Sequence, residues 1–437
     1  MVISMSQNKQ ILNYQDIEKE HFPCTKEWWC AEGFFTTAEN NKKWSFKASL
    51  YQGILKSKFI VSAYTITIFD LNNKKIYNYH SENDSCKLES EKDRFYIKYD
   101  KSYIKGSFPN YQMHFNDLKN NINLNLKLNS KTTPYWIAQQ VTDGWLPWGL
   151  GYYRYGFIPA NNIEGTIKIN NKNFSIKGKG YFEHIWGDFS FLNLKKLKRS
   201  IKKTLSTYSK LIGWWFHNQE KKIPKSIRFS TDNRPFGYDW FWTVLDNDWS
   251  IFYGNIIFWL LEGPATGILI LKKNENDYIE FGNINFKYNK MKYLSQYDFY
   301  YPIEIEIFAV KGNKKLYLNF KNISECFEDF YETTDKKIFL GFLICQVPCE
   351  IDGYYFDGKE KIYINGLSKM EFHRLLSVFG HNTLNFDIDI SPKSFGIKSN
   401  FNSHLLEKNF DIHLQFLPKP KLKIKFNKIN KKDLMIS

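Results

Sequence analysis

The stretch INLNLKLN, residues 122–129, alternates apolar and polar side chains at every position. Successive side chains of a β-strand point to opposite faces of the sheet, so this pattern predicts a strand with one buried and one solvated face. The same alternation recurs at residues 303–307, 386–390 and 422–426. Such runs, separated by turns rich in Asn, Gly and Asp, are typical of antiparallel sheets and barrels. The sequence therefore predicts an all-β fold.

The length and an internal similarity indicate two β-units. A chain of 437 residues exceeds what one core usually holds, because domains average roughly 150 residues. Residues 176–183 read IKGKGYFE and resemble residues 364–371, which read INGLSKME. A duplicated unit of roughly 190 residues would explain both observations. Chance similarity in an A/T-rich gene is the alternative.

One segment departs from the β pattern. Its apolar residues recur every three or four positions, which predicts an amphipathic helix: Leu194, Leu197, Ile201, Leu205, Tyr208, Ile212 and Trp215. Lysines fill the other faces, among them Lys195, Lys198 and Lys202, and no acidic residue falls between positions 194 and 212. The helix either packs on a barrel with a solvated basic face, or lies on anionic lipid with Trp214 and Trp215 at the depth of the headgroups.

These patterns together predict four segments. Residues 1–22 form an N-terminal extension, and residues 23–189 form the first antiparallel barrel. Residues 190–235 hold the basic amphipathic helix as an insertion, and residues 236–437 form the second barrel.

The charge balance bears on partners and location. The chain has 61 basic and 45 acidic residues, a net charge of +16, which favours contact with nucleic acid or a phospholipid surface. No zinc-finger spacing, phosphate loop or aromatic RNA-binding signature supports nucleic acid, so we expect no nucleic acid and a peripheral contact with anionic membranes. No apolar signal segment is visible at the start, and the apolar stretch 251–271 is interrupted at Glu262, Gly263 and Pro264, which predicts a cytoplasmic protein.

Tryptophan clusters are the candidate site. Phe and Tyr are abundant partly because of A/T-rich coding, but the 13 Trp residues do not follow from it. They cluster beside Gly and charged residues at 27–30, 180–188 and 237–242, as in the walls of a ligand cavity. The alternative is that they fill the core.

The second cluster suggests acid chemistry. On a strand, His184 and Trp186 share one face and Glu183 lies on the other. An indole face stabilises a positive charge, so Trp186 could stabilise a developing cation. Burial disfavours a charged carboxylate, so Glu183 would keep its proton, as the protonation of a carbon–carbon double bond requires. Alternatively, Glu183 and His184 satisfy backbone groups where a barrel closes.

The order of these motifs resembles a known family. Glu-Trp-Trp at 27–29, a Gly-rich stretch from 151 leading into Glu-His-Ile-Trp-Gly at 183–187, and Asp-Trp-Phe at 239–241 are similar to the carotenoid 1,2-hydratase/AttH-like group of lipocalin-like proteins. Tocopherol cyclases and fungal Diels–Alderases are more distantly similar. The resemblance covers about residues 22–260. It implies two lipocalin-like (calycin) barrels in tandem, no cofactor, and an isoprenoid or polyketide in an apolar tunnel. Because the sequence has no paired metal-binding histidines and no cysteines at metal-site spacing, we also expect no metal.

The resemblance also implies residue roles. His184 and Trp186 match the family's His-x-Trp, and Glu183 stands where the family has Asp. If Tyr253-Gly-Asn255 is the counterpart of the family's later Tyr-x-Asp, the acid of that motif is missing here, and Asp239 or Asp246 is the alternative acid. We therefore expect catalytic roles for Glu183, His184, Trp186 and Asp239. The expected ligand contacts are Glu27, Trp28, Trp29, Trp145, Tyr153, Trp240, Trp242 and Tyr253, and the expected membrane contacts are Lys195, Lys198, Lys202, Trp214 and Trp215.

Three functions remain open on the sequence. The first is a cofactor-free hydratase or cyclase that acts on an isoprenoid-like lipid. The second is a carrier that moves a sphingolipid-like cargo unchanged and docks on membranes through the helix. The third is a nucleic-acid-associated β-protein, which only the net charge supports.

Overall fold

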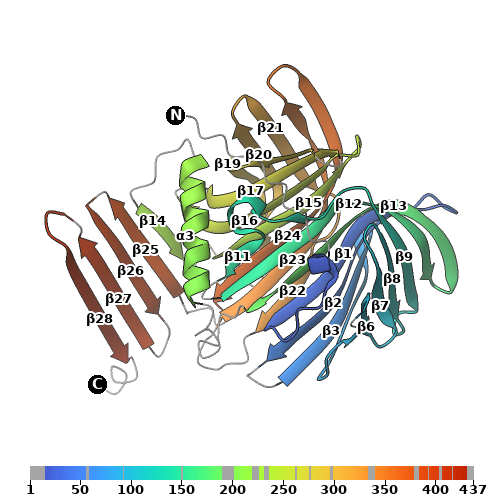
Figure 1. Cartoon of the computed structure of the whole chain (residues 1–437), viewed down its shortest axis with the longest axis horizontal. Coiled ribbons are helices and arrows are strands. Elements are labelled where there is room, and N and C mark those ends of the chain that lie inside the picture. The colour runs from blue at the N-terminus through green and yellow to red at the C-terminus, as the bar shows by residue number, and fades with distance from the viewer. Residues whose placement is uncertain are drawn as a thin grey trace. The chain divides into compact units, whose positions relative to one another are not determined.

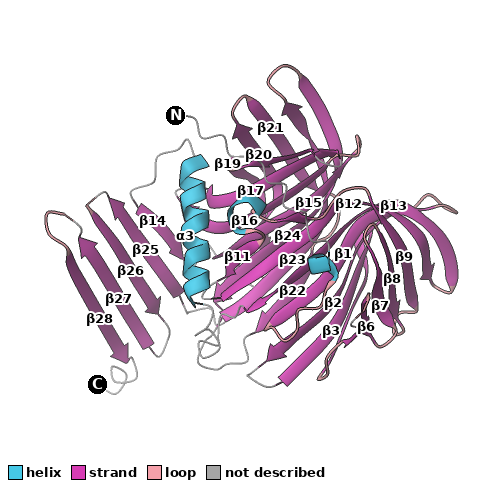
Figure 2. Cartoon of the chain, viewed as in Figure 1, coloured by secondary structure: helices cyan, strands magenta, loops and turns pink. Residues whose placement is uncertain are grey.

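The computed structural model describes fifteen stretches of the chain. They are residues 15–55, 59–91, 93–148, 151–188, 201–218, 226–230, 236–260, 263–274, 277–295, 299–332, 340–377, 383–391, 393–402, 406–415 and 417–430. Most of this part is strand, as the magenta arrows of Figure 2 show.

Sheet A is an antiparallel sheet of thirteen strands, which Figure 1 shows as a curled half-barrel. Its order is β4-β3-β2-β1-β13-β12-β9-β8-β7-β6-β5, with β10 and β11 paired to β12. Its strands are β1 (Lys26–Thr37), β2 (Lys43–Leu55), β3 (Phe59–Asp70), β4 (Lys75–Asp84), β5 (Glu89–Ser90), β6 (Phe95–Tyr99), β7 (Ser102–Ser107), β8 (Asn110–Asp117), β9 (Ile122–Ser130), β10 (Tyr135–Trp136), β11 (Trp145–Trp148), β12 (Gly151–Ile169) and β13 (Lys172–Asp188).

Sheet C has ten strands in the order β18-β17-β16-β15-β24-β23-β21-β20-β19, with β22 on β23. It curls in the same way. Its strands are β15 (Phe236–Leu245), β16 (Ser250–Leu260), β17 (Gly263–Asn274), β18 (Asp277–Phe281), β19 (Asn283–Leu294), β20 (Phe299–Lys311), β21 (Lys314–Asn322), β22 (Phe327–Glu332), β23 (Leu340–Phe356) and β24 (Lys361–Ser377). The prediction of an all-β fold of two curled antiparallel sheets in tandem is confirmed.

The two curled sheets share the order of their first strands. In each, the first strand has the next three strands on one side and pairs on the other side with a late strand of the same sheet: β1 with β13, and β15 with β24. Cys30 pairs with Glu183 in sheet A, and Trp240 pairs with Glu371 in sheet C. The two similar segments of the sequence therefore occupy equivalent strands, as a duplicated unit predicts.

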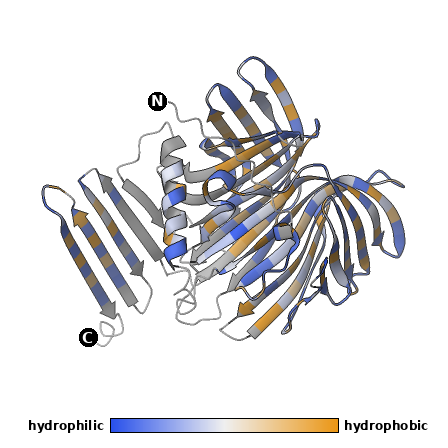
Figure 3. Cartoon of the chain, viewed as in Figure 1, coloured by the Kyte–Doolittle hydropathy of each residue, from blue (hydrophilic) through white to orange (hydrophobic). Residues whose placement is uncertain are grey.

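Sheet B is a separate five-stranded sheet in the order β14-β25-β26-β27-β28. Its strands are β14 (Ser226–Ser230), β25 (Thr383–Ser391), β26 (Ser394–Asn402), β27 (Leu406–Gln415) and β28 (Lys421–Asn430). On the edge strand β28, exposed apolar residues alternate with lysines, which gives the orange and blue stripes of Figure 3.

The described residues include three helices: α1 (Gln15–Glu18), α2 (Gln139–Thr142) and α3 (Ile201–Asn218). The structure confirms the predicted helix from Ile201 onward, and residues 189–200 lie outside the described residues. Among the α3 side chains whose burial is described, Thr204 and Thr207 are buried, whereas Leu205 of the predicted apolar stripe is 60% exposed. The Thr207 hydroxyl can be buried because it donates to the carbonyl oxygen of Lys203 at 2.8 Å. In the described chain, no helix has the length and hydropathy that crossing a membrane requires.

The chain divides into two compact units. The N-terminal unit comprises Met1–Ile68 and Tyr77–Leu211, and the C-terminal unit comprises Phe69–Ile76 and Ile212–Ser437. The N-terminal core includes Trp29, Phe46 and Phe182, and we call the face of sheet A that bears them its inner face. The C-terminal core includes Phe241 and Phe372, which define the inner face of sheet C in the same way. The domain boundaries drawn from the sequence stay predictions.

Gly156 on β12 provides a test of this packing. The Trp136 ring lies across its backbone, so a Cβ at Gly156 would meet Trp136 Cζ3 at 2.4 Å. We expect Gly156→Ala to destabilise the protein by about 1–3 kcal/mol, because the ring must move in a filled core. Urea unfolding measures the effect. Gly213→Ala on α3, where a Cβ has no neighbour within 4 Å, is the matched control and should stabilise by up to about 1 kcal/mol. Equal effects of the two changes would contradict the prediction.

Candidate functional site

Strands β1 and β13 place four predicted site residues together. The antiparallel register pairs Glu27 with Trp186 and Trp29 with His184. Because side chains alternate along each strand, all four lie on the inner face of sheet A. The prediction that His184 and Trp186 share a face is therefore confirmed, and Glu27 and Trp29 join them.

The centre of this group is a contact between Glu27 and His184. His184 Nε2 lies 3.0 Å from Glu27 Oε1, and both side chains are 0% exposed. His184 Nδ1 lies 3.0 Å from the carbonyl oxygen of Ile17, which can only accept a hydrogen bond. Nδ1 therefore carries the ring proton, and Nε2 of the neutral ring is an acceptor. The proton of the contact then belongs to the Glu27 carboxyl group, which donates to Nε2.

Burial favours this neutral pair. Desolvation raises the pKa of Glu27 to about 7, although the backbone N–H of His21 and the amide of Gln52 oppose the shift. Desolvation also lowers the pKa of His184 to about 3. Below neutral pH the carboxyl group is therefore protonated while the imidazole stays neutral. Glu27 is thus a carboxylic acid that retains its proton close to neutral pH.

Two residues missed by sequence reasoning complete the pair's surroundings. Gln52 Nε2 donates to Glu27 Oε2 at 2.9 Å, and the His21 backbone N–H donates to Oε1 at 2.7 Å. The His21 ring stacks on Trp186 with centroids 3.8 Å apart, and burial lowers its pKa to about 4. Gln52 lies opposite Glu27 on β2, so only the strand register could have identified it.

The segment from α1 to His21 covers this end of the inner face. Ile17 is fully buried, and its carbonyl oxygen accepts from His184. Asp16 pairs with Arg154 at 2.6 Å, and Glu18 accepts the Tyr111 hydroxyl at 2.8 Å. These side-chain contacts fix the segment over the Glu27–His184 pair, so residues assigned to an N-terminal extension belong to the site.

Aromatic rings surround the pair. Trp29 stacks on His184 with centroids 4.5 Å apart, and Trp186 meets Trp136 and Trp145 edge-on at 5.6 and 6.5 Å. The Arg154 guanidinium carbon lies 4.0 Å from the Trp136 ring centroid. The Trp136 ring face thus contacts the Arg154 cation in the geometry by which an aromatic ring stabilises positive charge.

Glu183 lies on the opposite face of β13. Its carboxylate accepts the Trp28 indole N–H at 3.2 Å and hydrogen bonds from the hydroxyls of Tyr155 and Tyr181. Burial, together with the charge of Glu183, raises the pKa of Tyr155 and Tyr181 well above the usual value for tyrosine. Both hydroxyl groups therefore keep their protons and donate hydrogen bonds. These hydrogen bonds occupy both carboxyl oxygens of Glu183 on the face opposite to His184. Tyr153 precedes Tyr155 by two positions on β12 and shares its face.

The other predicted site residues lie in the C-terminal unit. Asp239 is fully buried on the inner face of sheet C and accepts the Tyr288 hydroxyl. Tyr253 is buried on the same inner face. Trp240 and Trp242 are buried on the opposite face, because they alternate with Asp239 along β15.

Sheet C does not repeat the acid–imidazole contact at the equivalent inner positions. Asp239 pairs with Phe372 in the register in which Trp29 pairs with His184. On the opposite face, His373 Nε2 lies 3.0 Å from Glu371 Oε2. Among the described residues, no group of three or more His, Cys, Asp or Glu side chains could hold a metal ion.

The predicted membrane contacts are described only in part. Lys195 and Lys198 lie outside the described residues, as does the side chain of Trp215. Lys202 is exposed and Trp214 is half-buried, both on α3.

Comparison with solved structures identifies the fold. No protein-family model and no curated protein sequence matches the chain. An AttH-type protein of Nitrosomonas europaea superposes with a TM-score of 0.55 and 12% identity, over 85% of this chain and 99% of that one. Kievitone hydratase of Nectria haematococca superposes with a TM-score of 0.52 and 12% identity, over 80% of this chain and 88% of the hydratase. The chain therefore has the tandem lipocalin-like fold of these two proteins, as the motif resemblance predicts.

Proposed function

We propose that this protein binds a hydrophobic, isoprenoid-like molecule in the aromatic interior of its N-terminal unit and catalyses its acid-assisted hydration or cyclisation. The observation that carries the proposal is the buried contact between Glu27 and His184, enclosed by Trp29 and Trp186. Sequence reasoning favoured Glu183 or Asp239 as the acid. We assign this role to Glu27, because it is the carboxyl group that faces His184.

The chemistry follows from the protonated carboxyl group. Glu27 transfers its proton to one carbon of a trisubstituted double bond, which leaves a tertiary cation on the other carbon. The ring faces of Trp29 and Trp186 stabilise this cation. In hydration, water adds to the cation and its surplus proton returns to Glu27 directly or through His184 Nε2. In cyclisation, a second double bond attacks the cation and a carbon-bound proton returns instead. Neither route needs a cofactor.

The shared fold supports hydration as one of the two reactions. One of the solved structures with this fold is a hydratase. The fold alone is common to the two chains, so the roles of Glu27 and His184 rest on the geometry of this protein.

Substrate entry requires a movement. Glu27 and His184 are both fully enclosed, with Ile17 and His21 over them. A ligand reaches the pair only when the segment from α1 to His21 moves aside. Because this segment is held by hydrogen bonds and one ion pair, opening exchanges them for contacts with the ligand and with water.

Replacement of Glu27 tests the acid. Glu27→Gln keeps the shape but has no proton to transfer to carbon, so product formation should fall by about a hundredfold or more. Purified protein is incubated with acyclic isoprenoids in heavy-oxygen water, and products are analysed by mass spectrometry. Hydration incorporates the heavy oxygen, whereas cyclisation gives an isomer of unchanged mass. Glu183→Gln, the same change on the opposite face, is the control and should retain most activity. Unchanged turnover in Glu27→Gln would remove this residue from the mechanism.

The raised pKa of Glu27 predicts a pH-dependent stability difference. Between pH 4.5 and about 7 the folded protein keeps a proton that the unfolded chain releases, so this carboxyl group makes the protein less stable as pH rises. The Glu27→Gln variant has no carboxyl group at this position, so it does not lose this stability as pH rises. The difference in free energy of unfolding, variant minus wild type, should therefore increase by about 3 kcal/mol from pH 4.5 to pH 8. Urea unfolding at each pH measures the difference, and Glu164→Gln on the exposed side of β12 controls for the charge change. A difference independent of pH would show that Glu27 ionises normally.

A carrier that docks on membranes is the second candidate. It is favoured by α3, where Leu205 is 60% exposed on a helix with exposed lysines. Native mass spectrometry of protein purified from its host separates the two functions. A membrane lipid that is recovered unaltered after long incubation supports the carrier, whereas a hydrated or cyclised product supports the enzyme.

A further inference from the structure

A pocket of about 420 Å³ lies beside α3 in the N-terminal unit. Three elements line it: α2 contributes Thr142, β11 contributes Trp145, and α3 contributes the remaining residues, which are Lys202, Lys203, Ser206, Thr207 and Lys210. Ligand pockets for small molecules span roughly 300–1,000 Å³, so this volume suits an organic molecule better than a bare inorganic ion.

The residues that line the pocket include three lysines and no carboxylate. Lys202, Lys203 and Lys210 all line it, and in the described stretches no carboxylate forms an ion pair with any of the three. The neighbouring Arg154 differs, because Asp16 and Asp143 pair with it at 2.6 and 2.9 Å. Within the described part of the chain, the ammonium groups of the pocket therefore have no acidic partner of the kind that the nearby guanidinium has.

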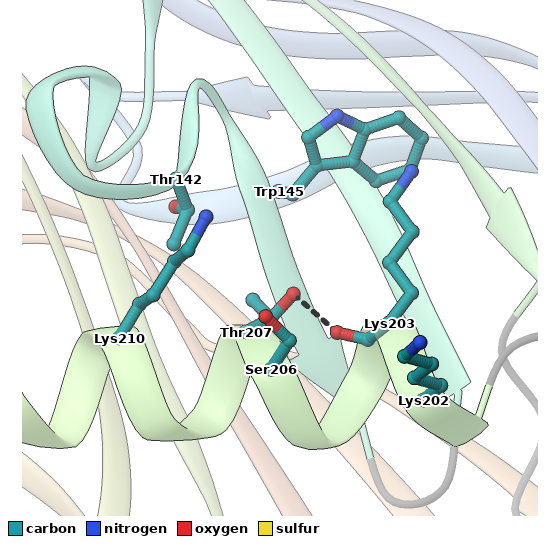
Figure 4. A pocket seen from close by; sticks show the side chains of 7 residues that line it. All are labelled: Thr142, Trp145, Lys202, Lys203, Ser206, Thr207 and Lys210. Atoms are coloured by element: carbon teal, nitrogen blue, oxygen red, sulfur yellow. Dashed lines mark hydrogen bonds between the residues drawn. The ribbon is translucent and has the colours of Figure 1, made fainter.

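Lys203 is held by rings. Its Nζ lies 3.4 Å from the Trp145 ring centroid and 4.5 Å from that of Tyr152. Burial and the charge of Arg154 lower the pKa of Lys203. Figure 4 shows Lys203 reaching from α3 to the Trp145 ring and Lys210 reaching toward Thr142. The ammonium groups of Lys203 and Lys210 thus line the same pocket as the Trp145 indole and the hydroxyl groups of the helix.

We propose that this pocket binds the phosphate-type anionic group of an amphiphilic molecule. Lys203 and Lys210 contact the anionic oxygens, Ser206 adds a hydroxyl donor, and Trp145 contacts the first apolar carbons. Ammonium groups suit a phosphate because charge-assisted hydrogen bonds to its oxygens are strong and several can form at once. The proposal involves none of the Glu27–His184 chemistry and stands independently of it.

Binding of simple probes tests the site. Titration calorimetry compares octyl phosphate with octyl glucoside, which has the same tail without the charge, and with inorganic phosphate. We expect octyl phosphate to bind at least about tenfold more tightly than octyl glucoside, since each charge-assisted hydrogen bond contributes to affinity. Added salt should weaken the octyl phosphate interaction alone, because screening acts on the charged headgroup.

A pair of substitutions places the binding in this pocket. Lys203→Gln combined with Lys210→Gln should weaken octyl phosphate binding by about tenfold or more and leave octyl glucoside unchanged. Lys172→Gln combined with Lys177→Gln removes the same charge from exposed positions on β13 and should change neither. A second measurement does not depend on these variants. The Trp145 indole resonance is assigned in the NMR spectrum as the signal that is missing in Trp145→Phe. This resonance should shift when octyl phosphate is added to wild-type protein.

Two further measurements distinguish a lipid headgroup from a free phosphate as the source of the anionic group. Flotation with phosphatidylcholine vesicles containing phosphatidic acid, lost in the Lys203/Lys210 variant, would identify a lipid headgroup in a bilayer. Binding of octyl phosphate without flotation would identify a free organic phosphate, and equal affinity for inorganic phosphate would identify the anion alone. Octyl phosphate affinity that equals octyl glucoside affinity, or that survives in the folded Lys203/Lys210 variant, would overturn the proposal. Loss of activity in Glu27→Gln has no bearing on these outcomes.

Discussion

The hydrogen bond between Glu27 and His184 is the constraint on which the N-terminal site depends. Both side chains are buried away from water. An isolated charge in such a place would cost many kcal/mol. The contact avoids that cost because the carboxyl group keeps its proton and the imidazole stays neutral, with the Ile17 carbonyl fixing the ring proton on Nδ1. The same burial that raises the pKa of Glu27 gives it the proton that the proposed chemistry consumes.

This constraint connects distant parts of the chain. The register of β1 and β13 sets the distance between Glu27 and His184, and β2 supplies Gln52 to the second carboxyl oxygen. The covering segment is in turn tied to the unit by Asp16, which pairs with Arg154 beside the Trp136 ring. A site of this kind is distributed over strands and an N-terminal segment, so a change in packing far from the acid alters its proton affinity.

The sequence predicted much of the fold and part of the site. Period-two alternation identified strands such as β9 and β20, and the motif order indicated the tandem lipocalin-like fold. Alternation also placed His184 and Trp186 on one face. The partner of His184 could not be derived, because the choice between Glu27 and Glu183 depends on which strands pair and in which register. The contribution of His21 was hidden for a different reason: short polar segments before a first strand carry no periodic signal.

The edge strand β28 has a consequence for the behaviour of the protein in concentrated solution. Its outer backbone groups could template the addition of a second chain, and exposed Ile424 and Phe426 would reinforce such stacking. Lysines at 421, 423 and 425 place like charges along that edge, and pairing two copies would bring these charges to neighbouring strands about 5 Å apart. Electrostatic repulsion between these lysines therefore opposes edge-to-edge pairing of β28 and fibril growth, and high ionic strength weakens this repulsion.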